Sequence, residues 1–149
     1  MPIKKANIED AEEILTLQKL AYKSEAKLHG DFQIPPLIET INELRDKFKT
    51  HVFLKVIANG KIIASVRVLL RDNTCHIGRL MVHPDFQNRG IATKLLIEIE
   101  SMFSCSRLEL FTGEKSVKAI HLYEKLGYKR FKAEKQAGNV TLVFLEKMR

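Results

Sequence analysis

The sequence has few cysteines and no long apolar runs. No apolar run approaches the length needed to span a bilayer, and no apolar segment of the signal-peptide type follows Met1–Lys5. Cys75 and Cys105 lack the CxxC spacing, so we interpret them as reduced cysteines. The five histidines have no metal-ligand spacing with another His, Cys or Asp. We therefore expect a cytoplasmic protein with no membrane partner and no bound metal.

The positively charged residues are not concentrated in a single run. Lysine and arginine number 25 against 18 acidic residues, a net charge of +7, but they are spread along the chain and not interleaved with aromatic residues. This pattern argues against a dedicated nucleic-acid-binding protein, whereas a polyphosphate ligand would use a fraction of the cations. With 149 residues, 45% of them hydrophobic, and no linker or repeat, we expect one domain over residues 1–149.

Hydrophobic periodicity predicts the element order β-α-α-β-β-β-α-β-α-β-β. The predicted strands cover residues 3–6, 51–58, 61–71, 74–82, 107–111, 128–133 and 140–146, and the predicted helices begin near residues 7, 40, 91 and 116. Asn59-Gly60, Asp72-Asn73 and residues 137–139 are predicted turns, Thr40 and Glu43 form a capping box, and Gly127 ends the last helix. We interpret residues 23–38 as a fraying helix end followed by a loop.

The most informative stretch runs from Leu80 to Phe103. A short apolar strand ends at Pro84, and a helix with one apolar stripe begins at Ile91. The turn between them holds the pattern Gln87-x-x-Gly90-x-Ala92. Small residues let the backbone approach a ligand, and the first N–H groups of a helix have no partner within it, so the turn is suited to bind a pyrophosphate.

This stretch resembles the acyl-CoA-binding motif of the GNAT superfamily of N-acyltransferases, (Gln/Arg)-x-x-Gly-x-(Gly/Ala). Val82-His83-Pro84 and the segment Ala119–Tyr128 also resemble that family, so the resemblance covers roughly residues 76–128. It implies an α+β fold of the three-layer type. The expected sheet is mixed, mostly antiparallel, of six to seven strands flanked by about four helices, with two central strands that splay apart.

The resemblance also implies a set of residues that hold acetyl-CoA between the splayed strands and at the turn. Thr93 would add a hydroxyl, with a solvent-facing helix residue as the alternative. Ser116 stands where the family often has Asn, so its contact would be shorter or water-mediated. The implied set is Leu80, Met81, Val82, Gln87, Asn88, Arg89, Gly90, Ile91, Ala92, Thr93, Ser116 and Tyr123.

Three residues are candidates for proton transfer. By resemblance, Tyr123 protonates the leaving thiolate, although its spacing alone would fit a core tyrosine. His76 stands where several family members carry a basic Glu, and an imidazole suits that task, but a half-exposed strand histidine without a role is the alternative. Glu109 on the next strand is the second candidate for the base.

The acceptor site is implied to lie near the first two helices. Glu25, Asp31 and Glu39 are candidates to hold a cationic amine and Tyr22 and Phe32 to wall it, with solvated loop residues as the alternative for each.

The sequence thus predicts an N-acetyltransferase that transfers an acetyl group from acetyl-CoA to a primary amine of a small molecule, by direct attack in a ternary complex. A protein N-terminus or lysine is the alternative acceptor. A non-catalytic acyl-CoA-binding domain and a basic nucleic-acid-binding domain are two further hypotheses, from different functional classes. Family members are often dimers, which makes a homodimer a further expectation.

Overall fold

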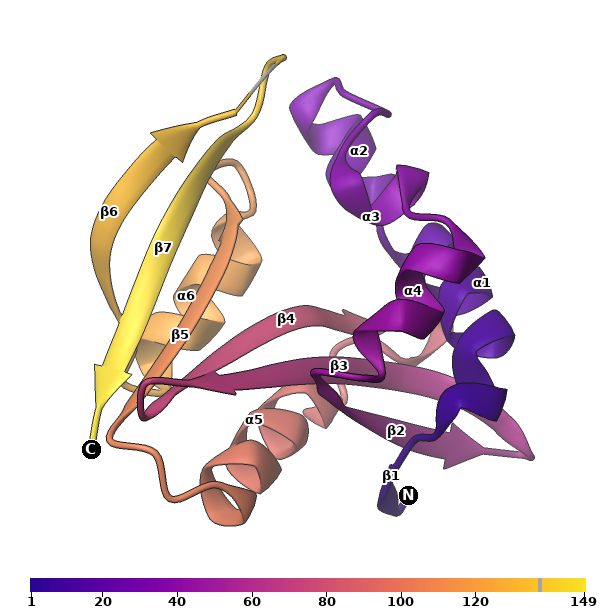
Figure 1. The fold of residues 1–149 in the computed structure, drawn as a ribbon. Helices are drawn as coiled ribbons and strands as arrows, with labels where there is room; N and C mark the ends of the chain where they lie inside the picture. Colours follow the sequence, from indigo (N-terminus) through magenta and orange to yellow (C-terminus); the bar gives the residue numbers. More distant parts are fainter. Residues whose placement is uncertain (137) are drawn as a thin grey trace.

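The protein folds around one mixed sheet, seen in a computed structural model that describes residues 1–136 and 138–149 (Figure 1). Its seven strands lie in the order β1-β2-β3-β4-β5-β7-β6. The strands are β1 (Ile3–Lys5), β2 (Val52–Ala58), β3 (Lys61–Arg71), β4 (Thr74–Val82), β5 (Arg107–Gly113), β6 (Lys129–Lys135) and β7 (Thr141–Met148). All pairs are antiparallel except β4 with β5, so the expected mixed, mostly antiparallel sheet is confirmed.

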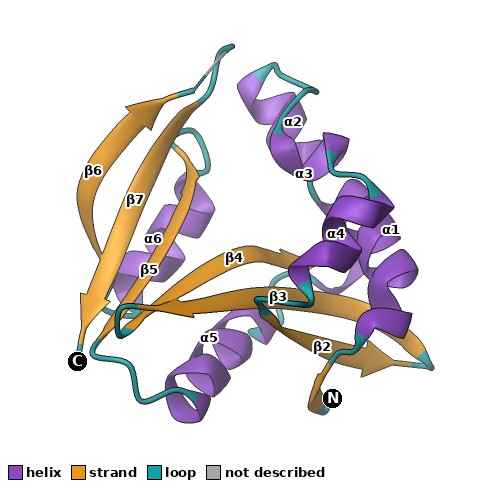
Figure 2. Ribbon diagram, viewed as in Figure 1, coloured by secondary structure: helices purple, strands orange, loops and turns teal. Residues whose placement is uncertain are grey.

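Helices cover both faces of the sheet and complete a three-layer α+β fold (Figure 2). They are α1 (Ala11–Ala21), α2 (Lys23–His29), α3 (Pro35–Ile38), α4 (Ile41–Lys47), α5 (Ile91–Met102) and α6 (Val117–Lys125), with 3-10 turns at Ile8–Asp10 and Pro84–Phe86. Leu95, Leu96 and Ile99 of α5 are fully buried against one face. Ile14 of α1 and Leu44 of α4 are fully buried against the other.

The two central strands are joined only at one end. Thr74 to His76 of β4 pair with Arg107 to Glu109 of β5, and no pairs follow although both strands continue. Beyond this point β4 and β5 diverge, as Figure 1 shows. The predicted splay is therefore confirmed, and it leaves backbone groups of β4 from Ile77 onward without a neighbouring strand on that side.

A β-bulge interrupts β4 just before the predicted cofactor segment. Ser65 pairs with Met81 and Arg67 with Gly78, so Arg79 and Leu80 together face the single residue between them on β3. Arg79 has a φ of 50°, in the left-handed region. A bulge changes the alternation of side chains, and here it brings Arg79 to the same side as Glu39, with Nε 3.5 Å from Oε1.

The local signals for turns and caps are confirmed. Asn59 and Gly60 both have positive φ, as a two-residue hairpin turn requires, and so do Asp72 and Asn73. The Thr40 hydroxyl accepts from the Glu43 N–H, and the Glu43 carboxylate accepts from the Thr40 N–H. Of the predicted last turn, Ala137 lies outside the described residues.

The prediction of a fraying helix end and then a loop over residues 23–38 is wrong in part, because two short helices lie there with only residues 30–34 between them. Residues 23–29 form α2, which buries Ala26 and His29 and ends at Gly30 with a φ of 64°. Pro35 and Pro36 begin α3, where a missing N–H costs nothing because the first N–H groups of a helix have no internal partner. Tertiary contacts of these two short helices supply the stability that their length does not.

The remaining differences lie at element ends. Strand β6 begins at Lys129 and runs to Lys135, β7 runs to Met148, and α6 begins at Val117. Within residues 1–136 and 138–149, no helix has both the length and the apolar character of a membrane span. The same residues contain no group of three or more His, Cys, Asp or Glu side chains arranged to hold a metal ion.

Candidate active site

The turn between β4 and α5 exposes a row of backbone donors. In the described part of the chain, the N–H groups of residues 87 to 93 donate to no other group, whereas the Lys94 N–H donates to the Gly90 carbonyl at 3.1 Å. Residues 87–90 are exposed, and a Cβ placed on Gly90, at φ 78°, would meet nothing within 4 Å. These donors and the helix N-terminus together suit an anionic ligand.

Cationic side chains stand beside these donors. Lys118 of α6 donates from Nζ to Asn88 Oδ1 at 3.1 Å, and the Arg89 guanidinium lies 5.0 Å from the centre of the Phe86 ring. Lys118 was not among the predicted residues, because it directly precedes Ala119–Tyr128, the segment whose residues match the family motif. Two cationic side chains, Lys118 and Arg89, therefore lie beside the free N–H groups at the N-terminus of α5.

The segment predicted to hold the pantetheine arm lines the open edge of β4. The Leu80 carbonyl accepts from the Tyr22 hydroxyl, and the Val82 carbonyl accepts from Gln87 Nε2, both at a long 3.4 Å. Met81 instead buries its side chain against α1 and α4. Weak bonds of this length can be exchanged for bonds to a ligand.

The two candidates for the base lie side by side where the strands begin to diverge. His76 and Glu109 are paired in register, and His76 Nδ1 is 3.6 Å from Glu109 Oε2. Arg107 also contacts this carboxylate, at 2.8 Å. The side chain of His76 remains 36% exposed, so it is open to a proton from outside the protein. The structure thus brings together two residues that sequence reasoning considered separately.

Tyr123 is buried, and the predicted acceptor residues Tyr22 and Glu25, both partly exposed, lie near it. Burial is the largest cause that raises the pKa of the Tyr123 phenol well above 10.0, followed by the neighbouring Tyr22 and Glu25. Burial likewise raises the pKa of Tyr22 to about 12, although the charge of Arg79 opposes it. Both phenols therefore hold their protons at neutral pH.

Helix α2 contacts the β5–α6 region across the opening. The Ser116 hydroxyl donates to the Glu25 carboxylate, so residues predicted for two different ligands bond with each other. His29 Nε2 accepts from the Lys115 N–H at 3.2 Å, and a Cβ on Gly113 would overlap the His29 ring. We call the contacts of Glu25 and His29 with residues 113–116 the α2 clasp.

The other predicted acceptor residues lie at the end of α2. Asp31 Oδ1 accepts from the Gln33 N–H at 2.8 Å, and its second oxygen lies close to Gly138 beside the β6–β7 turn. Phe32 is 55% exposed.

Glu39 is not a free carboxylate for an amine, which corrects its predicted role. It forms two hydrogen bonds with Arg67, of 3.3 and 3.1 Å, and accepts from Gln18 Nε2 at 2.8 Å. Burial alone would raise the pKa of Glu39, but the Gln18 bond and the charge of Arg67 outweigh burial and lower it. Arg67 and Arg79 were missed, because no signal along the chain announces a bulge or a pairing between distant elements.

These features suit the chemical groups of a coenzyme A thioester. The free N–H groups of residues 87–93 with Lys118 suit its pyrophosphate, and the unpaired edge of β4 suits its amides. The thioester end would then reach the point where β4 and β5 meet, beside His76.

One family model matches most of the chain. The family model described as the Acetyltransferase (GNAT) family matches residues 11–128. The chain is 31% identical over 133 residues to the UPF0157 protein YqkA of Bacillus subtilis (strain 168), which covers 89% of this chain and 38% of that protein. It is 35% identical over 80 residues to acetyltransferase ECA0875 of Pectobacterium atrosepticum, which covers 52% of this chain and 57% of that protein.

A solved structure extends the likeness to the whole fold. The PaiA N-acetyltransferase from Thermoplasma acidophilum, crystallised in complex with coenzyme A, superposes with a TM-score of 0.81. The match covers 99% of this chain and 98% of that one at 19% identity, so it shows a shared fold. The chain spans less than two thirds of the length of the two curated relatives.

Proposed function

Because the chain belongs to the acetyltransferase (GNAT) family, whose model matches residues 11–128, we propose that it transfers an acetyl group from acetyl-CoA to a primary amine of a small molecule by direct attack in a ternary complex. The observation that carries this proposal is the row of free N–H groups over residues 87–93, next to the open edge of β4. Few ligands need a pyrophosphate site and an extended amide-binding edge at once, and acetyl-CoA is one of them.

Binding is assigned mainly to backbone groups. The N–H groups of residues 87–93 hold the pyrophosphate, with the Thr93 hydroxyl and Lys118 beside them. The backbone of Leu80, Met81 and Val82 binds the pantetheine amides, as a neighbouring strand would. Ser116, whose hydroxyl donates to Glu25, contributes by holding α6 and α2 in place.

Bound acetyl-CoA supplies an activated acetyl thioester. His76, with Glu109 3.6 Å away, accepts the proton that the amine must lose as its nitrogen bonds to the acetyl carbon. The imidazole is partly exposed and sits where the gap between β4 and β5 opens, so an amine and a water can both reach it.

Tyr123 is assigned to the departing sulfur. Its raised pKa keeps the hydroxyl protonated at neutral pH, which a donor requires, but it also makes the phenol a weaker acid. Tyr123 therefore stabilises the thiolate by donating a hydrogen bond more than by transferring its proton completely.

The α2 clasp supports a small acceptor over a peptide. A peptide in extended form needs a groove open at both ends. Here Glu25 and His29 bridge to residues 113–116, and Asp31 lies close to Gly138. These contacts close one end of the space over β4 and β5.

Thiol release from acetyl-CoA across a panel of small amines and of peptides tests this function, alongside calorimetry with acetyl-CoA. We expect micromolar to millimolar binding and turnover with small amines. Tyr123→Phe keeps the ring and the fold, and should lower kcat with little change in the KM for acetyl-CoA.

Each contrary outcome contradicts a different part of the proposal. Turnover only with peptides would replace the small molecule with a protein acceptor. Binding without turnover would indicate an acyl-CoA-binding domain, and no binding would remove the cofactor site from this turn.

A further inference from the structure

Two guanidinium groups share one carboxylate on the α1–α4 side of the sheet. Arg67 is 7% exposed and binds Glu39 through two hydrogen bonds, while Arg79 reaches the same carboxylate only through Nε at 3.5 Å. That Nε is buried and has no hydrogen-bond partner in the described part of the chain. Burial and the nearby charge of Arg79 lower the pKa of Arg67, as two cations close together must. The group of three therefore carries one uncompensated positive charge.

A hollow of about 460 Å³ lies against these residues. Arg67, Arg79 and Glu39 line it together with residues of α3 and α4. Of the two other acids at its border, Asp46 pairs with the exposed Lys49 at 3.0 Å, whereas Glu43 accepts from the neutral Thr40 N–H at 2.8 Å and keeps its negative charge. Lys47 also lines the hollow and adds a further cation. With Asp46 offset by Lys49, the cations Arg67, Arg79 and Lys47 exceed the acids Glu39 and Glu43 by one, so a ligand would meet one net positive charge.

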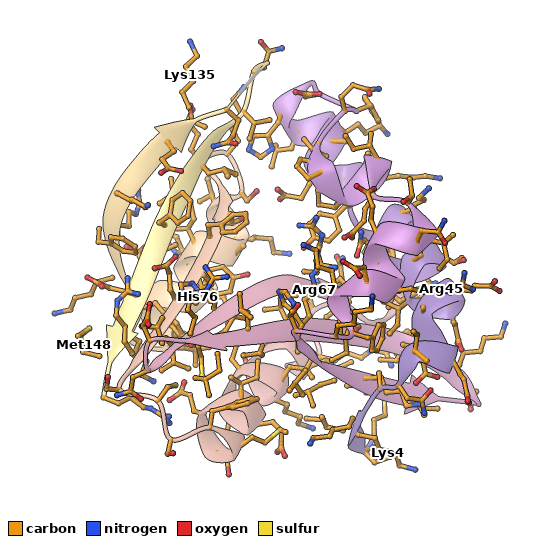
Figure 3. All side chains as sticks on the ribbon, viewed as in Figure 1. Lys4, Arg45, Arg67, His76, Lys135 and Met148 are labelled. Carbon is orange, nitrogen blue, oxygen red and sulfur yellow. The ribbon has the colours of Figure 1, made fainter. Side chains whose placement is uncertain are left out.

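The hollow is close to the proposed reaction centre. Arg79 directly precedes Leu80, the first residue of the segment assigned to the pantetheine arm. Arg67 is paired with Gly78, and His76 lies two residues before Gly78 on the same side of β3 and β4 (Figure 3). Diagonal neighbours of this kind have Cα atoms roughly 7–8 Å apart. Gly78 has no side chain, so none stands between the two arginines and His76 at that position.

We propose that the acceptor amine carries a carboxylate a few bonds from its nitrogen, and that Arg67 and Arg79 bind this carboxylate in the hollow. The inference rests on the proposed function and names its substrate class, an amino-acid-like small molecule. A carboxylate matches the planar donor fork of a guanidinium and supplies the missing negative charge. The amine at the other end then lies toward His76, which accepts its proton.

An ion cluster that needs no ligand would contain equal numbers of positive and negative charges. The pair of Arg67 and Glu39 with the Gln18 bond is such a unit. Arg79 is the extra charge, and a left-handed backbone conformation at a bulge holds it there at a cost. Removing Arg79 alone therefore tests the ligand and leaves the internal ion pair in place.

The experiment compares acceptors that differ only in charge. We would measure kcat/KM for ω-amino acids from β-alanine to 6-aminohexanoate, for their carboxamides, and for the matching aminoalkyl phosphonates. We expect at least one acid to exceed its carboxamide by roughly 10- to 100-fold, the effect of one charged hydrogen-bonded pair. Arg79→Gln should remove that preference, and Arg79→Lys should restore part of it. A preference for the phosphonates would assign the site to phosphate-bearing amines and overturn the carboxylate.

A second readout does not depend on turnover. Calorimetry of the best acid with the CoA-saturated protein should show binding that Arg79→Gln weakens by the same roughly 10- to 100-fold. Arg45→Gln is the matched control, since Arg45 on α4 pairs with Glu12 away from the hollow, and it should change neither measurement. Circular dichroism verifies that each variant is folded.

The outcomes separate this inference from the proposed function. Equal kcat/KM for acids and carboxamides, unchanged by Arg79→Gln, would overturn the carboxylate site while the acetyltransferase function stands. No turnover with any amine would contradict the function, and calorimetry would still decide whether the hollow binds carboxylates. Preferred acetylation of acidic peptides would overturn the small acceptor.

Discussion

At the scale of single residues, two side chains compete for one role. His76 and Glu109 are paired across β4 and β5 with 3.6 Å between Nδ1 and Oε2, and Glu109 is also held by Arg107 at 2.8 Å. The Glu109 carboxylate is already bound by the Arg107 guanidinium, whereas the His76 side chain is partly exposed and can receive a proton from outside the protein. The geometry therefore favours His76 as the base and Glu109 as the residue that orients it.

We expect His76→Gln to lower kcat at neutral pH by about 10²–10⁴-fold, the usual effect of losing a general base, with acetyl-CoA affinity nearly unchanged. Glu109→Gln should lower kcat by a smaller factor, because the imidazole of His76 remains. Steady-state kinetics over a range of pH, with calorimetry for acetyl-CoA, measure both. A larger loss in Glu109→Gln than in His76→Gln would reverse the two roles, and wild-type activity in both would leave the proton to water.

Glu39, which follows α3, is bound to Arg67 of β3 by two hydrogen bonds. Glu39→Gln leaves the buried Arg67 without a carboxylate, so we expect the free energy of unfolding to fall by about 3–5 kcal/mol. Glu12→Gln, which breaks the exposed pair with Arg45, should cost under about 1 kcal/mol and is the control. Urea unfolding followed by circular dichroism measures both.

The stability difference between wild type and Glu39→Gln has a predicted pH dependence. The pKa of Glu39 is lowered in the folded state from its ordinary 4.5, so the stability it contributes is fully present above that value. This stability is lost as the pH falls below 4.5 and through the folded-state pKa. The difference should therefore be constant from pH 7 to about 5.5 and shrink on further acidification. A difference that grows with acid would contradict the direction of the shift.

At the scale of elements, the turn between β4 and α5 should bind its ligand mainly through backbone. Gly90→Glu places a bulky anion beside the free N–H groups, and we expect acetyl-CoA affinity to fall on the order of 100-fold by like-charge repulsion. Gly60→Glu is the matched control. Both glycines have φ near the same value, 78° and 74°, and both have open space around the new Cβ.

The backbone strain of a left-handed Glu is thus common to both variants, about 1–2 kcal/mol in each, and it cancels in the comparison. Calorimetry with acetyl-CoA on folded protein decides the matter. Equal affinities of the two variants would show that this turn does not contact the cofactor.

At the scale of the whole molecule, two halves of the sheet meet through a short parallel pairing and through the α2 clasp. Three residue pairs join β4 to β5, and α2 contacts residues 113–116 from the other side of the opening. Figure 1 shows α1 to α4 grouped on one side of this opening and β5 to β7 on the other. The clasp therefore holds Glu25 in position across the opening.

The clasp can be tested by filling the space between its parts. Gly113→Ala would push its Cβ into the His29 ring, and we expect a loss of about 1–3 kcal/mol in the free energy of unfolding. In a His29→Ala background the ring is absent, so the added cost should largely vanish, giving a coupling of about 0.5–3 kcal/mol. Gly78→Ala is the control, because its Cβ would meet only Arg67 Cγ at 4.0 Å, an ordinary contact. The same cost of Gly113→Ala in both backgrounds would mean that the clasp does not exist in solution.

The sequence by itself determined the features that depend on neighbours in the chain. Local backbone preferences and hydrogen bonds over a few residues account for the strand pattern, the hairpin turn at Asn59-Gly60, the capping box of Thr40 and Glu43, and the turn with free N–H groups before α5. The prediction that β4 and β5 splay apart came from the resemblance of this turn to the family motif. These predictions concern the cofactor side of the candidate site.

Only the tertiary structure decided the acceptor side. Glu39 meets Arg67 from 28 positions away and Ser116 meets Glu25 from 91, and neither spacing has a periodic signature. The short helices α2 and α3 owe their existence to burial, which a short window cannot reveal. The bulge that turns Arg79 toward Glu39 arises from the pairing of β4 with β3. In a regular strand without a bulge, the Arg79 side chain would lie on the opposite face of the sheet. Contacts between distant segments depend on how the elements pack, and that information is spread over the whole chain.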